Sequence, residues 1–129
     1  MSATRRSLLR DQPNLPCTGK TLDKLIQPAI LTVLARGPLH GYAIVQRIAR
    51  MPVLHGQEPD AAGVYRTLRS LARRGCVTSS WDVSGTGPAR RLYELTKAGE
   101  QCLATWVETL GAYRKAIGGL LRAARRACS

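Results

Sequence analysis

The sequence predicts a mainly α-helical fold with one small β-hairpin and a long C-terminal helix. Two observations carry this prediction. Apolar residues recur at helical spacing in four segments, and a Gly-rich turn between two short strand-like segments separates the last helix from the others. The chain has 129 residues, which fits one compact domain. The arginines gather in the third helix and the hairpin, within a chain whose formal net charge is +12.

The N-terminal third predicts an arm followed by two helices. Residues 1–20 are polar and basic, contain prolines and lack apolar periodicity, so we expect a flexible basic arm. From Thr21 to Leu34 the apolar residues are spaced by three and four, which predicts a helix that Pro28 either opens or bends. A Gly-Pro pair ends this helix, and a second helix is expected over about residues 40–50.

The middle of the chain predicts a third helix and a hairpin. Asp60 is a good N-cap residue and Gly75 a good residue to follow a helix end, so the third helix lies between them. Residues 76–82 and 90–95 have strand character and are joined by a turn rich in Gly and Pro. Three helices followed by a two-stranded wing make a winged helix-turn-helix, and we assign residues 21–95 to this DNA-binding domain.

The predicted third helix has one apolar and one cationic face. At about 100° per residue, Val64, Leu68 and Leu71 share one side, and three arginines share the other. A solvated basic face is one reading of this pattern. However, two further arginines follow the Gly-rich turn, where the tip of the hairpin is expected to project. A helix in the major groove beside a basic wing can hold duplex DNA. The predicted DNA-binding residues from this reasoning are Arg66, Arg69, Ser70, Arg73, Arg90 and Arg91.

Three motifs, in order, resemble the PadR-like transcriptional regulators. Residues 34–42 (LARGPLHGY) resemble the join of the first two helices in that family. Residues 63–71 (GVYRTLRSL) resemble its recognition helix. Residues 90–99 (RRLYELTKAG) resemble its second wing strand and the start of its last helix. The resemblance covers about residues 28–110 and implies a winged-helix DNA-binding regulator.

The resemblance also implies roles for single residues. Tyr65 would contact a phosphate, and residues near Arg90 would touch the DNA backbone, whereas the helical wheel alone leaves Tyr65 equally open to a packing role. Family members often carry Pro and Glu where this sequence has Arg66 and Ala72. Both differences make the helix more positive, so DNA binding is still expected and only the operator preference is put in doubt.

Residues 96–129 are assigned to a dimerisation helix and a basic tail. The helical pattern runs from Thr96 to about residue 124, with Gly118-Gly119 as a point where the helix could end or kink. From Leu103 the apolar residues alternate spacings of three and four, as in an a/d seam. The helix would span about 45 Å, more than a small winged domain can cover, so we expect a homodimer. The resemblance also implies a homodimer, because the C-terminal helix is the dimerisation element of the PadR-like regulators. The predicted interface comprises Leu103, Trp106, Leu110, Tyr113, Ile117 and Leu120.

These observations predict a regulator, and more specifically a repressor, that binds a palindromic operator as a homodimer. Its half-sites would lie about 34 Å apart, and an effector would release it. Some relatives bind flat aromatic effectors near the dimer interface, so Trp106 is the candidate effector contact. Two alternatives stay open: a redox- or metal-responsive regulator acting through Cys17 or Cys128, and a basic nucleic-acid-binding protein without operator choice.

Other classes of protein are disfavoured. No apolar run reaches the ~18–20 residues of a membrane span, and no apolar segment of a secretory signal follows the N-terminal arginines, so we expect a cytoplasmic protein. The sequence lacks phosphate-loop, zinc-protease and nucleophile-elbow motifs. Its four cysteines form no Cys-x-x-Cys pair and are expected to be free thiols. We therefore predict no catalytic residue, no cofactor and no metal ligand.

Overall fold

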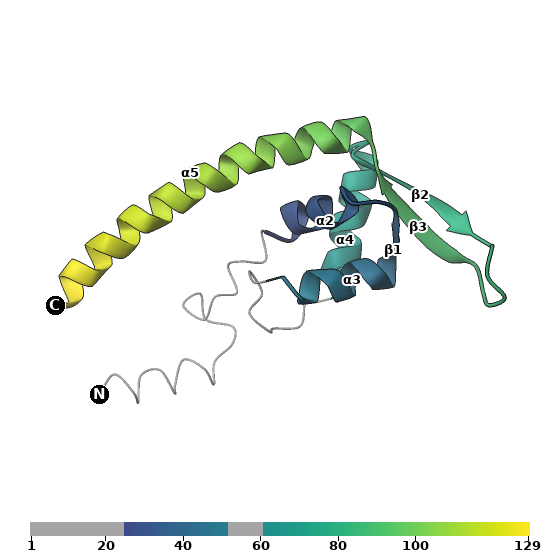
Figure 1. The fold of residues 1–129 in the computed structure, drawn as a ribbon, viewed down its shortest axis with the longest axis horizontal. Helices are drawn as coiled ribbons and strands as arrows, with labels where there is room; N and C mark the ends of the chain where they lie inside the picture. Colours follow the sequence, from purple (N-terminus) through teal and green to yellow (C-terminus); the bar gives the residue numbers. More distant parts are fainter. Residues whose placement is uncertain (1–24, 52–60) are drawn as a thin grey trace, which may run out of the picture.

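The computed structural model describes residues 25–51 and 61–129, and it confirms the predicted fold class (Figure 1). The basic arm expected over residues 1–20 and the cap expected at Asp60 lie outside the described residues. The elements, in chain order, are α2 (Ile26–Leu34), β1 (Leu39–His40), α3 (Gly41–Ala49), α4 (Ala61–Arg73), β2 (Val77–Asp82), β3 (Arg90–Leu95) and α5 (Lys97–Cys128).

Helix α2 is the most buried helix of the domain. It begins at Ile26, so Pro28 stands in its first turn, where a missing N–H group leaves no helical hydrogen bond unmade. Pro28 therefore opens this helix and does not bend it. Pro28 and the residues around it are buried, as are apolar side chains of α3, α4 and the base of the sheet, and together they form one aliphatic core: Ile30, Leu31, Ile44, Ile48, Val64, Leu68, Leu71 and Val77.

Helix α4 ends where the sequence predicts, at a left-handed glycine. Gly75 has a φ of +77°, a conformation that costs glycine little because it has no side chain. The N–H groups of Gly75 and Cys76 donate to the carbonyl oxygens of Ala72 and Leu71, at 3.1 and 2.9 Å. These two hydrogen bonds form a Schellman motif, which satisfies the last carbonyls of the helix and turns the chain into β2.

The sheet has three antiparallel strands in the order β1-β3-β2, one more than the predicted wing. The added strand, β1, is only two residues long, and Leu39 and His40 pair with Tyr93 and Leu92 of β3. So short a strand carries no alternation that a sequence pattern could reveal. Strands β2 and β3 extend beyond the helices as a wing, on the side opposite the free end of α5 (Figure 1).

Helix α5 agrees with the predicted extent to about residue 124, and it runs on to Cys128 without interruption at Gly118-Gly119. Each glycine lowers helix propensity by about 1 kcal/mol but leaves every backbone hydrogen bond intact, so a pair of them weakens a long helix without breaking it. The helix leads away from the domain and its C-terminal half stands apart (Figure 1). None of the helices in the described ranges is at once long and apolar enough to pass through a lipid bilayer.

The start of α5 is tied to the turn that follows α4. The Thr96 hydroxyl caps α5 by accepting from the Gly99 N–H at 3.0 Å, and it donates to the Gly75 carbonyl at 2.6 Å. The Thr96 N–H donates to the Cys76 carbonyl at 3.1 Å. Gly99 lies so close to that carbonyl that an added Cβ would overlap the oxygen. One threonine therefore joins the ends of two helices.

We predict that Thr96→Ala lowers the free energy of unfolding by about 1–2 kcal/mol, because it removes the helix cap and leaves the Gly75 carbonyl without this partner. Urea unfolding at a fixed protein concentration measures the change. Thr105→Ala is the matched control, since the Thr105 hydroxyl only donates to the Gln101 carbonyl on an exposed turn of the same helix. Equal losses in the two variants would contradict the proposed role of Thr96.

Candidate nucleic-acid interface

Helix α4 has the two faces that its sequence predicts. Val64, Leu68 and Leu71 are fully buried against the core. The side chains of Arg66, Arg69 and Arg73 are exposed on the helix, while Tyr65 and Ser70 are half-buried between the two faces. The cationic stripe is therefore available to a partner along the length of α4.

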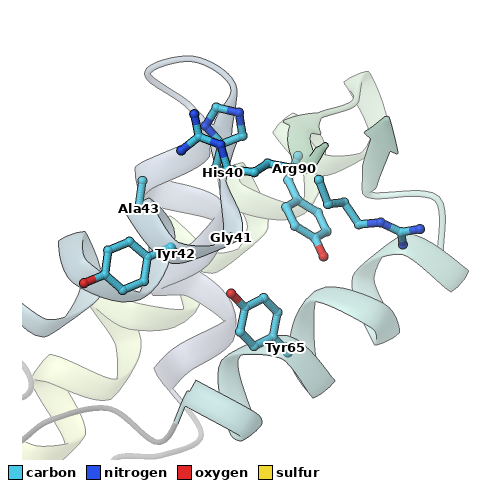
Figure 2. Close-up of a pocket in the computed structure, with 8 residues that line it drawn as sticks. His40, Gly41, Tyr42, Ala43, Tyr65 and Arg90 are labelled. Atoms are coloured by element: carbon cyan, nitrogen blue, oxygen red, sulfur yellow. The ribbon is translucent and has the colours of Figure 1, made fainter. Parts of the chain in front are cut away.

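Tyr65 lies against the first residue of α3. A Cβ added to Gly41 would come within 2.6 Å of Cε1 and 2.9 Å of the hydroxyl oxygen of Tyr65, so the ring occupies the space that any other residue would fill. Figure 2 shows Tyr65 facing Gly41, while the Tyr42 ring is directed away. Packing and phosphate contact are thus compatible roles for Tyr65, because its ring packs and its hydroxyl reaches the N-terminus of α3.

Tyr65 lines a hollow of about 250 Å³ whose walls come from β1, α3, α4 and β3 (Figure 2). Helix α3 contributes its N-terminus, whose backbone N–H groups and dipole favour an anion. No acidic residue stands in the first turn of α3, and His40 makes no side-chain cap there. The lining residues are His40, Gly41, Tyr42, Ala43, Tyr65, Arg90, Arg91 and Tyr93. These groups can donate hydrogen bonds to the oxygens of one phosphate.

The two wing arginines begin strand β3 and do not occupy the hairpin tip. Arg90 pairs in register with Asp82 and Arg91 with Trp81. The Arg91 guanidinium carbon lies 4.8 Å from the centroid of the Trp81 ring, a cation–π contact. The turn at residues 83–89 projects further, so both arginines stand nearer to α4 than the sequence suggests.

The acidic residue of the wing is held by neighbouring groups. One Asp82 carboxylate oxygen accepts from the Ser84 hydroxyl at 2.6 Å and the Ser84 N–H at 3.0 Å, and the other lies 2.8 Å from His40 Nε2. The Ser84 hydrogen bonds, followed by that of His40, hold the pKa of Asp82 well below its usual range. The His40 contact links β1 to β2 across β3. In the described part of the chain no ion pair engages the side chains of Arg69, Arg73, Arg90 and Arg91, so their charges are not offset there.

The predicted dimer residues divide into two groups along α5. Leu103 and Trp106 pack at the edge of the core of their own domain, and Trp106 Nε1 donates to Gln27 Oε1 at 2.9 Å. Further along the helix, the exposed fraction of the apolar side chains rises from 36% at Leu110 to 71% at Leu120. Between these two positions Tyr113 and Ile117 are also exposed. Within the residues that the structure describes, the outer part of the seam is therefore exposed.

The cysteines occupy three different environments. Cys76 is buried and Cys102 is half-buried beside it, and burial raises the pKa of the Cys102 thiol. Cys128 is exposed, and Cys17 lies outside the described residues, so thiol sensing by these two stays a prediction. No cluster of three His, Cys, Asp or Glu side chains that could hold a metal occurs in residues 25–51 or 61–129.

Sequence reasoning missed the contribution of α3 to this site. It assigned His40 and Gly41 to the start of a helix without connecting that helix end to Tyr65, which lies 24 positions after Gly41. The available signal was the glycine itself, because a buried glycine inside a helical pattern often marks a close approach of two elements. Only the packing of α3 on α4 shows which side chain makes that approach.

The chain matches a family model described as the transcriptional regulator PadR-like family over residues 30–105. No curated protein sequence is similar enough to count as a relative. Among solved structures, a candidate transcriptional regulator from Thermoplasma acidophilum is 30% identical with a TM-score of 0.69, and the alignment covers 79% of this chain and 95% of that one.

Two further structures place the fold in the same group. Bacillus subtilis PadR in complex with operator DNA is 28% identical with a TM-score of 0.56, over 64% of this chain and 45% of that one. A PadR-like transcriptional regulator from Bacillus cereus has a TM-score of 0.66 over 79% of this chain and 96% of that one, but at 19% identity it supports the fold alone. The arrangement of helices and wing described above is thus shared with PadR-like regulators.

We predict that Gly41→Ala displaces Tyr65, because the new methyl group would come within 2.6 Å of its ring. Overpacking of this kind costs about 1–3 kcal/mol, and duplex DNA affinity should fall with it. Gly111→Ala is the control, since nothing lies within 4 Å of a Cβ there and the change should stabilise α5 by up to about 1 kcal/mol. Thermal unfolding and fluorescence anisotropy with labelled DNA measure both effects. Unchanged stability and affinity in Gly41→Ala would contradict the close contact.

We predict that Asp82 contributes a pH-dependent part of the stability. Its folded-state pKa is lowered, so the contribution is present above the unfolded-state pKa of about 3.9 and is lost as the pH falls from there towards the folded-state value. The wild type should therefore exceed Asp82→Asn in unfolding midpoint at about pH 5, above the unfolded-state pKa of Asp82. The difference should shrink below about pH 4. A difference that stays constant down to pH ~3 would show that the Asp82 charge does not stabilise the wing.

Proposed function

Since the chain belongs to the PadR-like family of transcriptional regulators, we propose that it is a cytoplasmic repressor that binds a palindromic operator as a homodimer and leaves it when an effector binds. Occupation of promoter DNA would block transcription directly. The single observation that carries the DNA-binding part is the hollow that brings the N-terminus of α3, the Tyr65 hydroxyl and two wing arginines together beside the cationic face of α4.

The proposed DNA contacts are of two kinds: phosphate contacts that position the protein, and base contacts that read the sequence. Tyr65, Arg90 and Arg91 would hold phosphate at the hollow, because their donors and the N-terminus of α3 suit an oxyanion. The exposed side of α4 would then lie in the major groove, where guanidinium groups can read guanine edges. Bacillus subtilis PadR, whose structure contains operator DNA, supports this assignment. The residues proposed for the groove are Arg66, Arg69, Ser70 and Arg73.

The outer seam of α5 supports the proposed homodimer. Leu110, Tyr113, Ile117 and Leu120 are exposed on one helix, and burial of such apolar surface contributes about 25 cal/mol per Å². A second copy offers the same seam, so a two-fold interface can cover both at once. Leu103 and Trp106 would lie at the inner end of the interface. Two recognition helices related in this way would meet half-sites about 34 Å apart.

The proposed effector site lies near Trp106. An apolar hollow of about 230 Å³ lies between α2, the end of α3 and α5, and its lining includes Leu110, one turn along α5 from Trp106. The indole N–H of Trp106 already donates to Gln27, so an effector would meet the ring and not the N–H group. A flat, mostly apolar molecule fits this chemistry.

We predict that Arg69→Ala/Arg73→Ala weakens binding to the upstream DNA of the protein's own gene without unfolding the protein. Loss of a guanidinium that reads a base edge costs about 1–3 kcal/mol, so the variant should lose more affinity for this DNA than for a shuffled duplex of the same length. Fluorescence anisotropy with both duplexes at one salt concentration measures this. Arg125→Ala/Arg126→Ala is the matched control, because it removes the same charge from the far end of α5.

Two results would contradict the proposal. Equal losses in the two double variants would mean that net charge, not the α4 face, determines binding. Equal affinity of the wild type for its upstream DNA and for a shuffled duplex would favour a basic protein without operator choice. Sedimentation at micromolar concentration tests the dimer separately, and a monomer there would remove the palindromic operator from the proposal.

A further inference from the structure

Trp81 is an exposed aromatic residue whose position the core does not explain. Its side chain is 62% exposed, in a chain whose aromatic content is only 5%. Strand alternation and the ladder register place Trp81 on the same face of the wing as Val77 and Tyr93, both of which are buried at its base. At Trp81 this face of the wing no longer lies on the core, so burial of the indole contributes little to the stability of the domain.

The neighbour of Trp81 on that face is an arginine of the candidate interface. Arg91 stands opposite Trp81 in the ladder, and its guanidinium carbon lies 4.8 Å from the ring centroid. Arg91 also lines the hollow between α3, α4 and β3. The indole is thus connected to the proposed phosphate site through a single side chain.

A guanidinium stacked on an indole face has a defined orientation. The stack holds the guanidinium over the ring, while its N–H edges remain able to donate to an anion. A free arginine side chain loses rotamer freedom when it binds, and holding it in place before binding reduces that loss. The pair therefore presents a cation whose position is set before DNA binds, on a residue that also lines the hollow.

We propose that Trp81 is a positioning residue for DNA binding, whose ring holds the Arg91 guanidinium ready to contact a phosphate of the bound duplex. The proposal rests on the proposed function, because it names how one cation of that interface is oriented. It assigns the role to the ring face, so a smaller aromatic ring retains part of it and an aliphatic side chain does not.

The test is a double-mutant cycle on duplex affinity in the full chain, with the upstream DNA of the gene as probe. Trp81→Ala and Arg91→Ala should each weaken binding about three- to tenfold for a dimer and lower the salt dependence by similar amounts. The double variant should bind no more weakly than Arg91→Ala alone. Trp81→Phe should recover most of the affinity that Trp81→Ala removes.

Two controls separate positioning from a structural role. Val83→Ala changes another exposed apolar residue of the wing, at 75% exposure, and should leave affinity and salt dependence as in the wild type. Unfolding midpoints of all variants show whether the wing stays folded. A purely structural role of Trp81 would lower the midpoint and the affinity together, without the matching change in salt dependence.

The possible failures point to different causes. If the wild type binds the duplex and Trp81→Ala binds it with the same affinity, the inference is overturned and the proposed function stands. Additive losses in the cycle would show that Trp81 and Arg91 act independently, and Trp81→Phe binding as weakly as Trp81→Ala would show that the ring face is not what matters. A wild-type protein that binds no duplex would remove the proposed function itself, and this inference with it.

Discussion

The contact between Gly99 and the Cys76 carbonyl is the constraint on which the arrangement of the domain depends. Because no side chain separates them, the first turn of α5 lies directly on the turn that ends α4. Thr96 then fixes both helix ends with its hydrogen bonds to Gly75, Cys76 and Gly99. The helix proposed to read DNA and the helix proposed to dimerise are therefore joined by backbone and not by a flexible linker.

A second close contact, between Gly41 and Tyr65, forms the candidate nucleic-acid interface. Gly41 lets Tyr65 lie on the N-terminus of α3, so one glycine brings a helix dipole and a phenol hydroxyl to the same hollow. The arginines around it repel one another without a bound anion. Asp82 stays ionised because its pKa is lowered, but its carboxylate contacts Ser84 and His40 and forms no ion pair with an arginine in the described part of the chain. The arrangement therefore keeps positive charge available to an anionic partner instead of neutralising it within the chain.

Sequence reasoning recovered what local patterns encode. Apolar periodicity located the helices, and the stop at Gly75 followed from glycine's tolerance of positive φ. It missed β1, because two residues have no pattern and pair only when β3 is in place. It left an end or kink of α5 open at Gly118-Gly119, because propensity alone does not include the cooperativity that carries a long helix through two glycines. Sequence patterns could not predict the hollow, since its lining comes from four elements that meet only in the folded domain.

The contacts that hold α5 to its own domain also determine how the proposed effector could act. Gly99 fixes the first turn of α5 to the end of α4, and Trp106, two turns later, is hydrogen-bonded to Gln27 of α2. Because α5 is held at two points in its N-terminal half, a tilt of α5 would move the whole domain with it and would not bend the helix at Gly99. An effector at the seam would therefore change the angle between two domains and leave the hollow in each unaltered. In the proposed dimer a palindromic operator would fix the spacing of both recognition helices, so such a rotation would be sufficient to separate one of them from its half-site.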